Sequence, residues 1–149
     1  MDLAENMQKY ENYRDMNVRL KRALKGGFYL EAVFIEYGII EDRLDSVLRY
    51  EGNSINSKDH VSIDRKISKV KKLAEEKKGL ARKYFKEDFL DSIYNWKERR
   101  NPLIHELMKQ PFLTDEMSAV ADEGEVIVKE LCRCANNYKR AVERKINKA

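Results

Sequence analysis

The sequence contains few residues that interrupt helices. Its 149 residues include only two prolines and six glycines, which leaves little room for the many turns of a β-sandwich. Hydrophobic residues make up 42% of the chain, which is enough for a core, and at this length we expect a single domain spanning residues 1–149. The composition therefore favours an all-α protein.

Long apolar runs are also missing. No stretch approaches the roughly 20 consecutive apolar residues that a helix needs to cross a bilayer. The chain begins MDLAENMQKY, which has neither the basic n-region nor the apolar h-region of a signal peptide. We therefore expect no association with a membrane and a cytoplasmic location.

Cysteine is scarce and poorly spaced for metal binding. The two cysteines are Cys132 and Cys134, and on a helix residues two apart point roughly 200° away from each other. With only two histidines in the chain, no second ligand pair completes a zinc site. We expect two free thiols with a structural role, and neither a metal nor another cofactor.

Charge is abundant and unevenly distributed. Charged residues make up 38% of the chain, and the net charge is +4. Residues 58–88 hold eleven Lys or Arg against six acids, and residues 132–149 hold six against one. Residues 111–131, between them, hold one lysine and six acids. This pattern suits a protein that binds a polyanion on one side, although such runs are also typical of solvated helix faces.

Apolar residues recur at helical spacing along most of the chain. The pattern predicts a first helix that ends at residues 26–27, which are both glycine. It predicts a central, most buried helix over residues 28–50, because apolar residues occur on more than one of its faces. Residues 52–57 have the composition of a loop. Either Ser62 or Asp59 is expected to cap the amphipathic helix that follows.

The second half of the chain continues this pattern. Apolar spacing predicts a short helix over residues 80–85, a break at residues 87–88 and a longer helix over residues 89–109. Residues 110–113 should connect it to a final helix that is capped by Thr114 and runs nearly to the end. We therefore expect a four- to five-helix up-and-down bundle.

One segment carries the strongest chemical signal: Arg100-Asn101-Pro102-Leu103-Ile104-His105. Arginine binds phosphate and keeps its charge, and histidine transfers protons near neutral pH. With this composition, an arginine four to six residues before a histidine should arise by chance about half the time. Requiring an asparagine directly after the arginine, and four residues between the arginine and the histidine, lowers this chance to roughly 1%. We therefore regard this segment as the candidate active site.

Helix geometry supports a shared site. Asn101 and His105 are four residues apart and lie on one face of a helix. Arg100 lies about 140° around the helix from His105, an angle that a long guanidinium side chain can reduce. Asn101 has three candidate partners: the imidazole, the substrate or a backbone carbonyl freed by Pro102.

Arg100-Asn101-x-x-x-His105 in a small all-helical chain resembles the Arg-polar-x(3–5)-His motif of the HEPN superfamily. The resemblance covers the helical layout of the whole chain, and its specific part is these three residues. It implies a HEPN-like helical domain and a homodimer in which two motifs form one composite cleft. Many members of the superfamily are metal-independent ribonucleases of toxin–antitoxin, phage-defence and CRISPR systems, whereas others are binding or scaffold modules without known nuclease activity.

The resemblance implies catalytic roles for Arg100, Asn101 and His105. An RNA 2′-hydroxyl can attack its own 3′-phosphate when one imidazole takes the proton and another protonates the leaving oxygen. The arginine would hold the phosphate and stabilise its developing charge. Three further basic residues are near enough in sequence to help bind the RNA backbone: Lys97, Arg99 and Lys109.

Two functional hypotheses remain open: a homodimeric endoribonuclease, or a non-catalytic helical module that binds RNA, a nucleotide or a protein partner. In the second, His105 caps a carbonyl or pairs with Glu106.

In one toxin branch, a partner nucleotidyltransferase modifies a tyrosine two residues after the histidine. Here that residue is Leu107, which excludes modification at this position. A protein inhibitor or a nucleotidyltransferase is still an expected type of partner. Trp96 and Tyr94 should lie in the core or a dimer interface rather than stack on bases.

Overall fold

A computed structural model of the chain describes residues 3–50, 61–76, 79–107, 109 and 114–148. All regular structure in these residues is helical, which confirms the all-α bundle, and α4 is only a single turn. No described helix is long and apolar enough to cross a bilayer. The expected connections at 52–57 and 110–113 lie outside the described residues. In chain order the helices are α1 (Leu3–Gly26), α2 (Tyr29–Tyr50), α3 (Ile63–Glu75), α4 (Ala81–Tyr84), α5 (Glu87–Leu107) and α6 (Thr114–Asn147).

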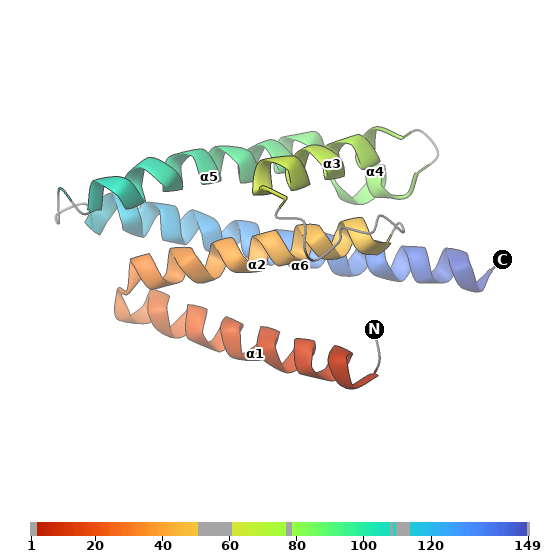
Figure 1. The fold of residues 1–149 in the computed structure, drawn as a ribbon, viewed down its shortest axis with the longest axis horizontal. Helices are drawn as coiled ribbons and strands as arrows, with labels where there is room; N and C mark the ends of the chain where they lie inside the picture. The colour runs from red at the N-terminus through yellow and green to blue at the C-terminus, as the bar shows by residue number, and fades with distance from the viewer. Residues whose placement is uncertain (1–2, 51–60, 77–78, 108, 110–113, 149) are drawn as a thin grey trace.

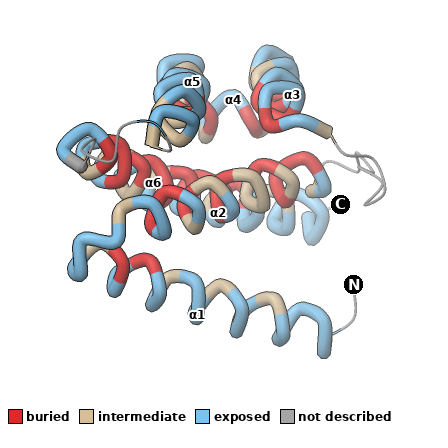
Figure 2. The backbone as a smooth tube through the Cα atoms, turned by 60° about the vertical axis from the view of Figure 1, so that its left-hand side comes forward, coloured by how far each residue is buried: buried red, intermediate tan, exposed pale blue. Residues whose placement is uncertain are grey.

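The helices form three layers (Figure 1). α1 lies on one side, α2 and α6 form the middle, and α3, α4 and α5 lie on the other side. α2 packs against α1, α3, α5 and α6, which confirms that it is the central helix. Buried residues concentrate in the middle layer and on the surfaces that face it, whereas most of α1 is exposed (Figure 2).

The turn between α1 and α2 depends on Gly27. Its φ of +76° lies in the left-handed region, which glycine adopts without the steric penalty of a Cβ. The Gly27 N–H donates to the Leu24 carbonyl at 3.3 Å. The Phe28 N–H donates to the Ala23 carbonyl at 2.8 Å, which completes a Schellman motif. The glycines at 26–27 therefore end α1 as predicted.

The starts of α3 and α5 can be compared with their predictions. Ser62 caps α3, because its hydroxyl accepts a hydrogen bond from the Arg65 N–H at 3.3 Å. α5 begins at Glu87, so the predicted break at residues 87–88 is wrong by about two residues. Glu87 and Asp88 instead occupy the first turn, where their negative charges favour the positive end of the helix dipole. α5 then continues through Pro102 to its end.

Large aromatic side chains fill the core between the outer and middle layers. Trp96 is fully buried, as expected, and its indole N–H donates to the Val120 carbonyl at 2.8 Å. The Phe85 and Tyr138 rings meet edge to face, with their centroids 5.5 Å apart. Cys134 is a buried free thiol in this core, in agreement with a structural role.

A carboxyl group also lies in the core. Glu36 of α2 is fully buried, and neither of its side-chain oxygens has a hydrogen-bond partner in the described part of the chain. It occupies space left by Gly124 of α6, where a Cβ would lie 2.6 Å from the Glu36 carboxyl carbon and 2.9 Å from the Trp96 ring. Burial, helped by the negative charges of Glu125 and Asp122, raises the pKa of Glu36 to about 9. The side chain is therefore neutral at pH 7.

We predict that Glu36→Gln stabilises the protein and that the gain grows with pH. Between the ordinary pKa of a glutamate and about 9, the folded state holds a proton on Glu36 that the unfolded chain has lost. The free energy of unfolding of the wild type therefore falls as pH rises through this range, by up to roughly 1.4 kcal/mol per pH unit from this group. Urea unfolding of both proteins at several pH values between about 5 and 9 measures the difference.

Glu31→Gln is the matched control, since Glu31 is an exposed carboxylate on the same helix. Its effect on stability should not vary with pH in this range. If the difference between Glu36→Gln and the wild type also stays constant, Glu36 is ionised in the folded protein and the neutral buried carboxyl is wrong.

Candidate functional site

The side chain of Arg100 reaches from α5 to α2. Its guanidinium carbon lies 4.0 Å from the centroid of the Tyr37 ring and 5.5 Å from that of Phe34. Both distances are within the range of cation–π interactions. The two aromatic residues are three apart on α2 and therefore share one side of that helix. Packing of α5 beside α2 thus determines where this guanidinium lies.

The positive charge of Arg100 is not neutralised by a carboxylate. None of the ion pairs within the described residues involves Arg100. Its Nη1 donates to the Asn101 side-chain oxygen at 2.8 Å, and its buried Nε has no hydrogen-bond partner in the part of the chain described. Burial lowers the pKa of Arg100, but a guanidinium stays protonated at neutral pH. The site therefore contains a half-buried cation that an anion can stabilise.

Neighbouring cations on α5 are neutralised within the chain. Lys97 is buried and pairs with Asp64 at 2.5 Å and with Glu98 at 2.6 Å. Burial lowers the pKa of Lys97, but the hydrogen bonds to these carboxylates outweigh burial and raise it. Arg99 forms an ion pair with Glu123. Of these three adjacent cations, only Arg100 keeps an unpaired charge.

The structure joins two of the three predicted catalytic residues directly. Arg100 and Asn101 are hydrogen-bonded, so the Asn101 oxygen has a partner that was not among the three expected. His105 is exposed one turn further along α5, and Lys109 is exposed just beyond the helix. Among the described residues no hydrogen bond or ion pair links His105 to Arg100 or Asn101.

Sequence reasoning missed Phe34 and Tyr37. Apolar residues on more than one face of α2 predicted the most buried helix, whereas Phe34 is 53% exposed and faces Arg100. The only sequence signal for this contact was that a large aromatic residue, Phe34, lies on a second apolar face of the helix. Burial, together with the charge of Glu41, raises the pKa of Tyr37, so its phenol stays protonated and keeps a hydroxyl that can donate to an anion.

These side chains together suit the binding of a phosphate. A guanidinium on aromatic rings offers two parallel N–H donors to phosphate oxygens, and partial burial strengthens the interaction by reducing the local dielectric. Within the described residues, no group of three His, Cys, Asp or Glu side chains gathers to hold a metal ion.

Comparisons of this chain with protein-family models, curated proteins and solved structures give no match. The similarity to the HEPN motif therefore depends on Arg100, Asn101 and His105 themselves. What the site does has to be inferred from these residues and their surroundings.

We predict that Arg100→Gln changes the free energy of unfolding by no more than about 1 kcal/mol, because the lost cation–π contacts are offset by relief from burying an unpaired charge. Lys97→Ala should cost more, about 1–2 kcal/mol, since it removes a buried stem and leaves Asp64 and Glu98 without their cation. Urea unfolding of both variants at neutral pH provides the comparison. An equal or larger cost for Arg100→Gln would identify Arg100 as a structural residue.

Proposed function

We propose that this protein is a homodimeric, metal-independent endoribonuclease of the HEPN type that acts on cytoplasmic RNA. The observation that supports the proposal best is the half-buried guanidinium of Arg100, which lies on two aromatic rings and has no carboxylate partner among the described residues. It shares α5 with an exposed histidine, His105. The resemblance to HEPN ribonucleases suggests a role as a toxin or in phage defence.

The proposed reaction uses the 2′-hydroxyl of RNA as the nucleophile. One His105 takes the 2′-hydroxyl proton while the 2′-oxygen forms a bond to the adjacent phosphorus. The bond from phosphorus to the 5′-oxygen breaks, and a second, protonated His105 donates a proton to that oxygen. The products are a 2′,3′-cyclic phosphate and a 5′-hydroxyl. Arg100 holds the phosphate and stabilises the charge on its oxygens, and Asn101 orients the guanidinium through their hydrogen bond.

A homodimer follows from the need for two proton-transfer groups. The proposed site in one chain has a single histidine, His105, and histidine is the side chain that ordinarily exchanges protons near neutral pH. A two-fold axis close to α5 would bring the second His105 opposite the first. The pair could then act as base and acid in the same step.

The remaining predicted RNA-binding residues contribute unequally in this proposal. Lys109 is exposed and available to a phosphate. Lys97 and Arg99 would have to exchange a carboxylate partner for RNA. The largest electrostatic contribution should therefore come from Arg100.

We predict that the purified protein cleaves single-stranded RNA in the presence of EDTA and that His105→Ala lowers the rate by about 100-fold or more, because general acid–base catalysis contributes roughly 10²–10⁴. Arg100→Ala should have a similar effect through loss of phosphate binding. His60→Ala, which removes the only other histidine of the chain, is the matched control and should cleave at the wild-type rate. Gel analysis of 5′-labelled RNA, with a test for the cyclic phosphate, measures the reaction.

Three results would contradict this proposal. Cleavage that survives His105→Ala would show that another group, or a contaminant, performs the chemistry. A protein that is monomeric by light scattering at working concentrations would remove the second histidine. RNA binding that depends on Arg100 without any cleavage would instead favour the non-catalytic binding module.

A further inference from the structure

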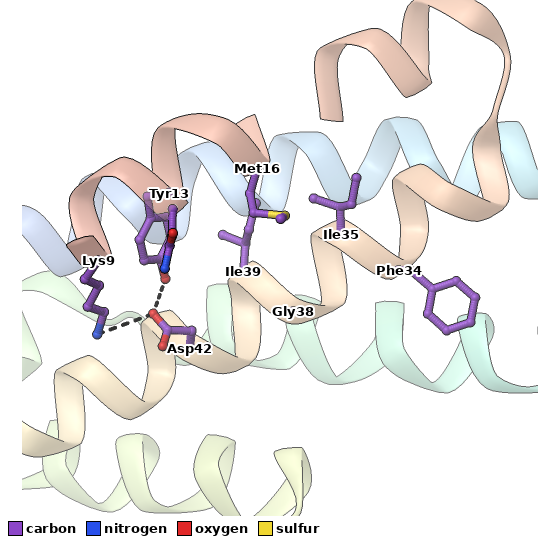
Figure 3. A pocket seen from close by; sticks show the side chains of 9 residues that line it. Lys9, Tyr13, Met16, Phe34, Ile35, Gly38, Ile39 and Asp42 are labelled. Atoms are coloured by element: carbon purple, nitrogen blue, oxygen red, sulfur yellow. Dashed lines mark hydrogen bonds and ion pairs between the residues drawn. The ribbon is translucent and has the colours of Figure 1, made fainter. Parts of the chain in front are cut away.

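A groove of about 420 Å³ lies between α1 and α2 and begins at Phe34. Its volume is within the range of small-molecule sites. Met16 of α1, with Ile35 and Ile39 of α2, gives it apolar walls. Phe34 lies at one end of the groove (Figure 3) and is also within cation–π distance of Arg100. The groove and the proposed phosphate site therefore share one exposed aromatic residue.

The opposite end of the groove is polar. Tyr13 donates a hydrogen bond to Asp42, and Lys9 pairs with the same carboxylate at 3.6 Å, as Figure 3 shows. The Nε of Arg43 donates to the Tyr13 hydroxyl at 2.7 Å. Asn12 lines the groove beside this cluster and adds an amide. The groove thus combines apolar walls with hydrogen-bonding groups at its end.

Gly38 indicates that the groove is kept open. It lies within α2 one turn after Phe34, where glycine destabilises a helix by roughly 0.5–1 kcal/mol relative to alanine. A Cβ at this position would meet no heavy atom of the described residues within 4 Å. Packing inside the chain therefore does not require glycine here, unlike at Gly124. Gly38 lines the groove, and a long side chain at this position would occupy part of it.

We propose that this groove receives a base of single-stranded RNA whose phosphate is held by Arg100, an inference that rests on the proposed ribonuclease function. A nucleobase has apolar faces and hydrogen-bonding edges, which match the apolar walls and the polar end of the groove. Exposed aromatic residues beside cationic side chains are the usual stacking surfaces for unpaired bases. The unpaired charge of Arg100 beside Phe34 favours a polyanion over an apolar protein segment.

Unpaired bases should bind better, because a base inside a duplex must first be unpaired and unstacked, which costs free energy. In this arrangement Phe34 and Gly38 give the protein its preference for single-stranded RNA. Arg100 and His105 perform the cleavage.

The test measures binding separately from cleavage. A fluorescent single-stranded 2′-O-methyl RNA of mixed sequence lacks the nucleophilic hydroxyl, and fluorescence anisotropy follows its binding to the full-length protein. Phe34→Ala removes the aromatic face, and Gly38→Met fills the groove. Each should weaken binding by about 5- to 100-fold, the range expected for loss of one stacked base. Gly38→Met should not lower the thermal unfolding temperature, since it replaces glycine by a better helix former in open space.

Tyr10→Ala is the matched control, because Tyr10 is an exposed aromatic residue of α1 that does not line the groove. It should bind RNA like the wild type. Normal binding by Phe34→Ala and Gly38→Met, with weak binding by Arg100→Ala, would overturn the groove proposal and leave the phosphate site intact. Normal binding by all three variants would contradict both proposals. If the two groove variants instead dissociate a dimer and bind RNA normally, the groove is a protein interface and the base-binding proposal is wrong.

Discussion

The insertion of Glu36 opposite Gly124 constrains how α2 is rotated about its own axis. Glu36 is buried where α2 crosses α6, and its carboxyl group fits only because residue 124 has no side chain. At 100° per residue, positions two before and two after Glu36 point roughly 200° away from it. Phe34 and Gly38 therefore face outward, and Tyr37 lies on the flank toward α5. The rotation of α2 that buries Glu36 against α6 thus also presents the aromatic surface under Arg100 and the open groove beside it.

Electrostatics separates Arg100 from the other half-buried or buried cations. Where these side chains leave water, carboxylates from the same or a neighbouring helix accompany them, as expected from the cost of burying an unpaired charge. Arg100 has aromatic rings and a neutral amide in place of a carboxylate. Aromatic rings hold a guanidinium in place without neutralising it, so the charge remains available to an external anion. These paired cations include Arg43, Lys66 and Lys97, and the exposed Arg99 is paired as well.

Local features of the structure could be predicted from the sequence, and contacts between helices could not. The end of α1 at residues 26–27 and the cap at Ser62 depend on nearest neighbours along the chain. The break before α5 was misplaced because acidic residues read equally well as a loop or as a first helical turn. The contact of Arg100 with Phe34 and Tyr37 joins two helices far apart in sequence, and apolar periodicity gives no information about which faces meet. The motif could be recognised because its residues are close together in the sequence. The aromatic residues around Arg100 could not, because they belong to another helix.

The position of Arg100 also bears on the proposal that two chains share one site. Arg100 and His105 leave α5 about 140° apart on an ideal helix, and the aromatic rings draw the guanidinium toward α2. The imidazole, in contrast, is exposed near the end of the helix. A phosphate bound at Arg100 therefore approaches this face of α5 from the α2 side, and a histidine from a second chain can reach its other side. The divergence of the two side chains would weaken a site contained in one chain, and it is compatible with the proposed cleft shared by two copies.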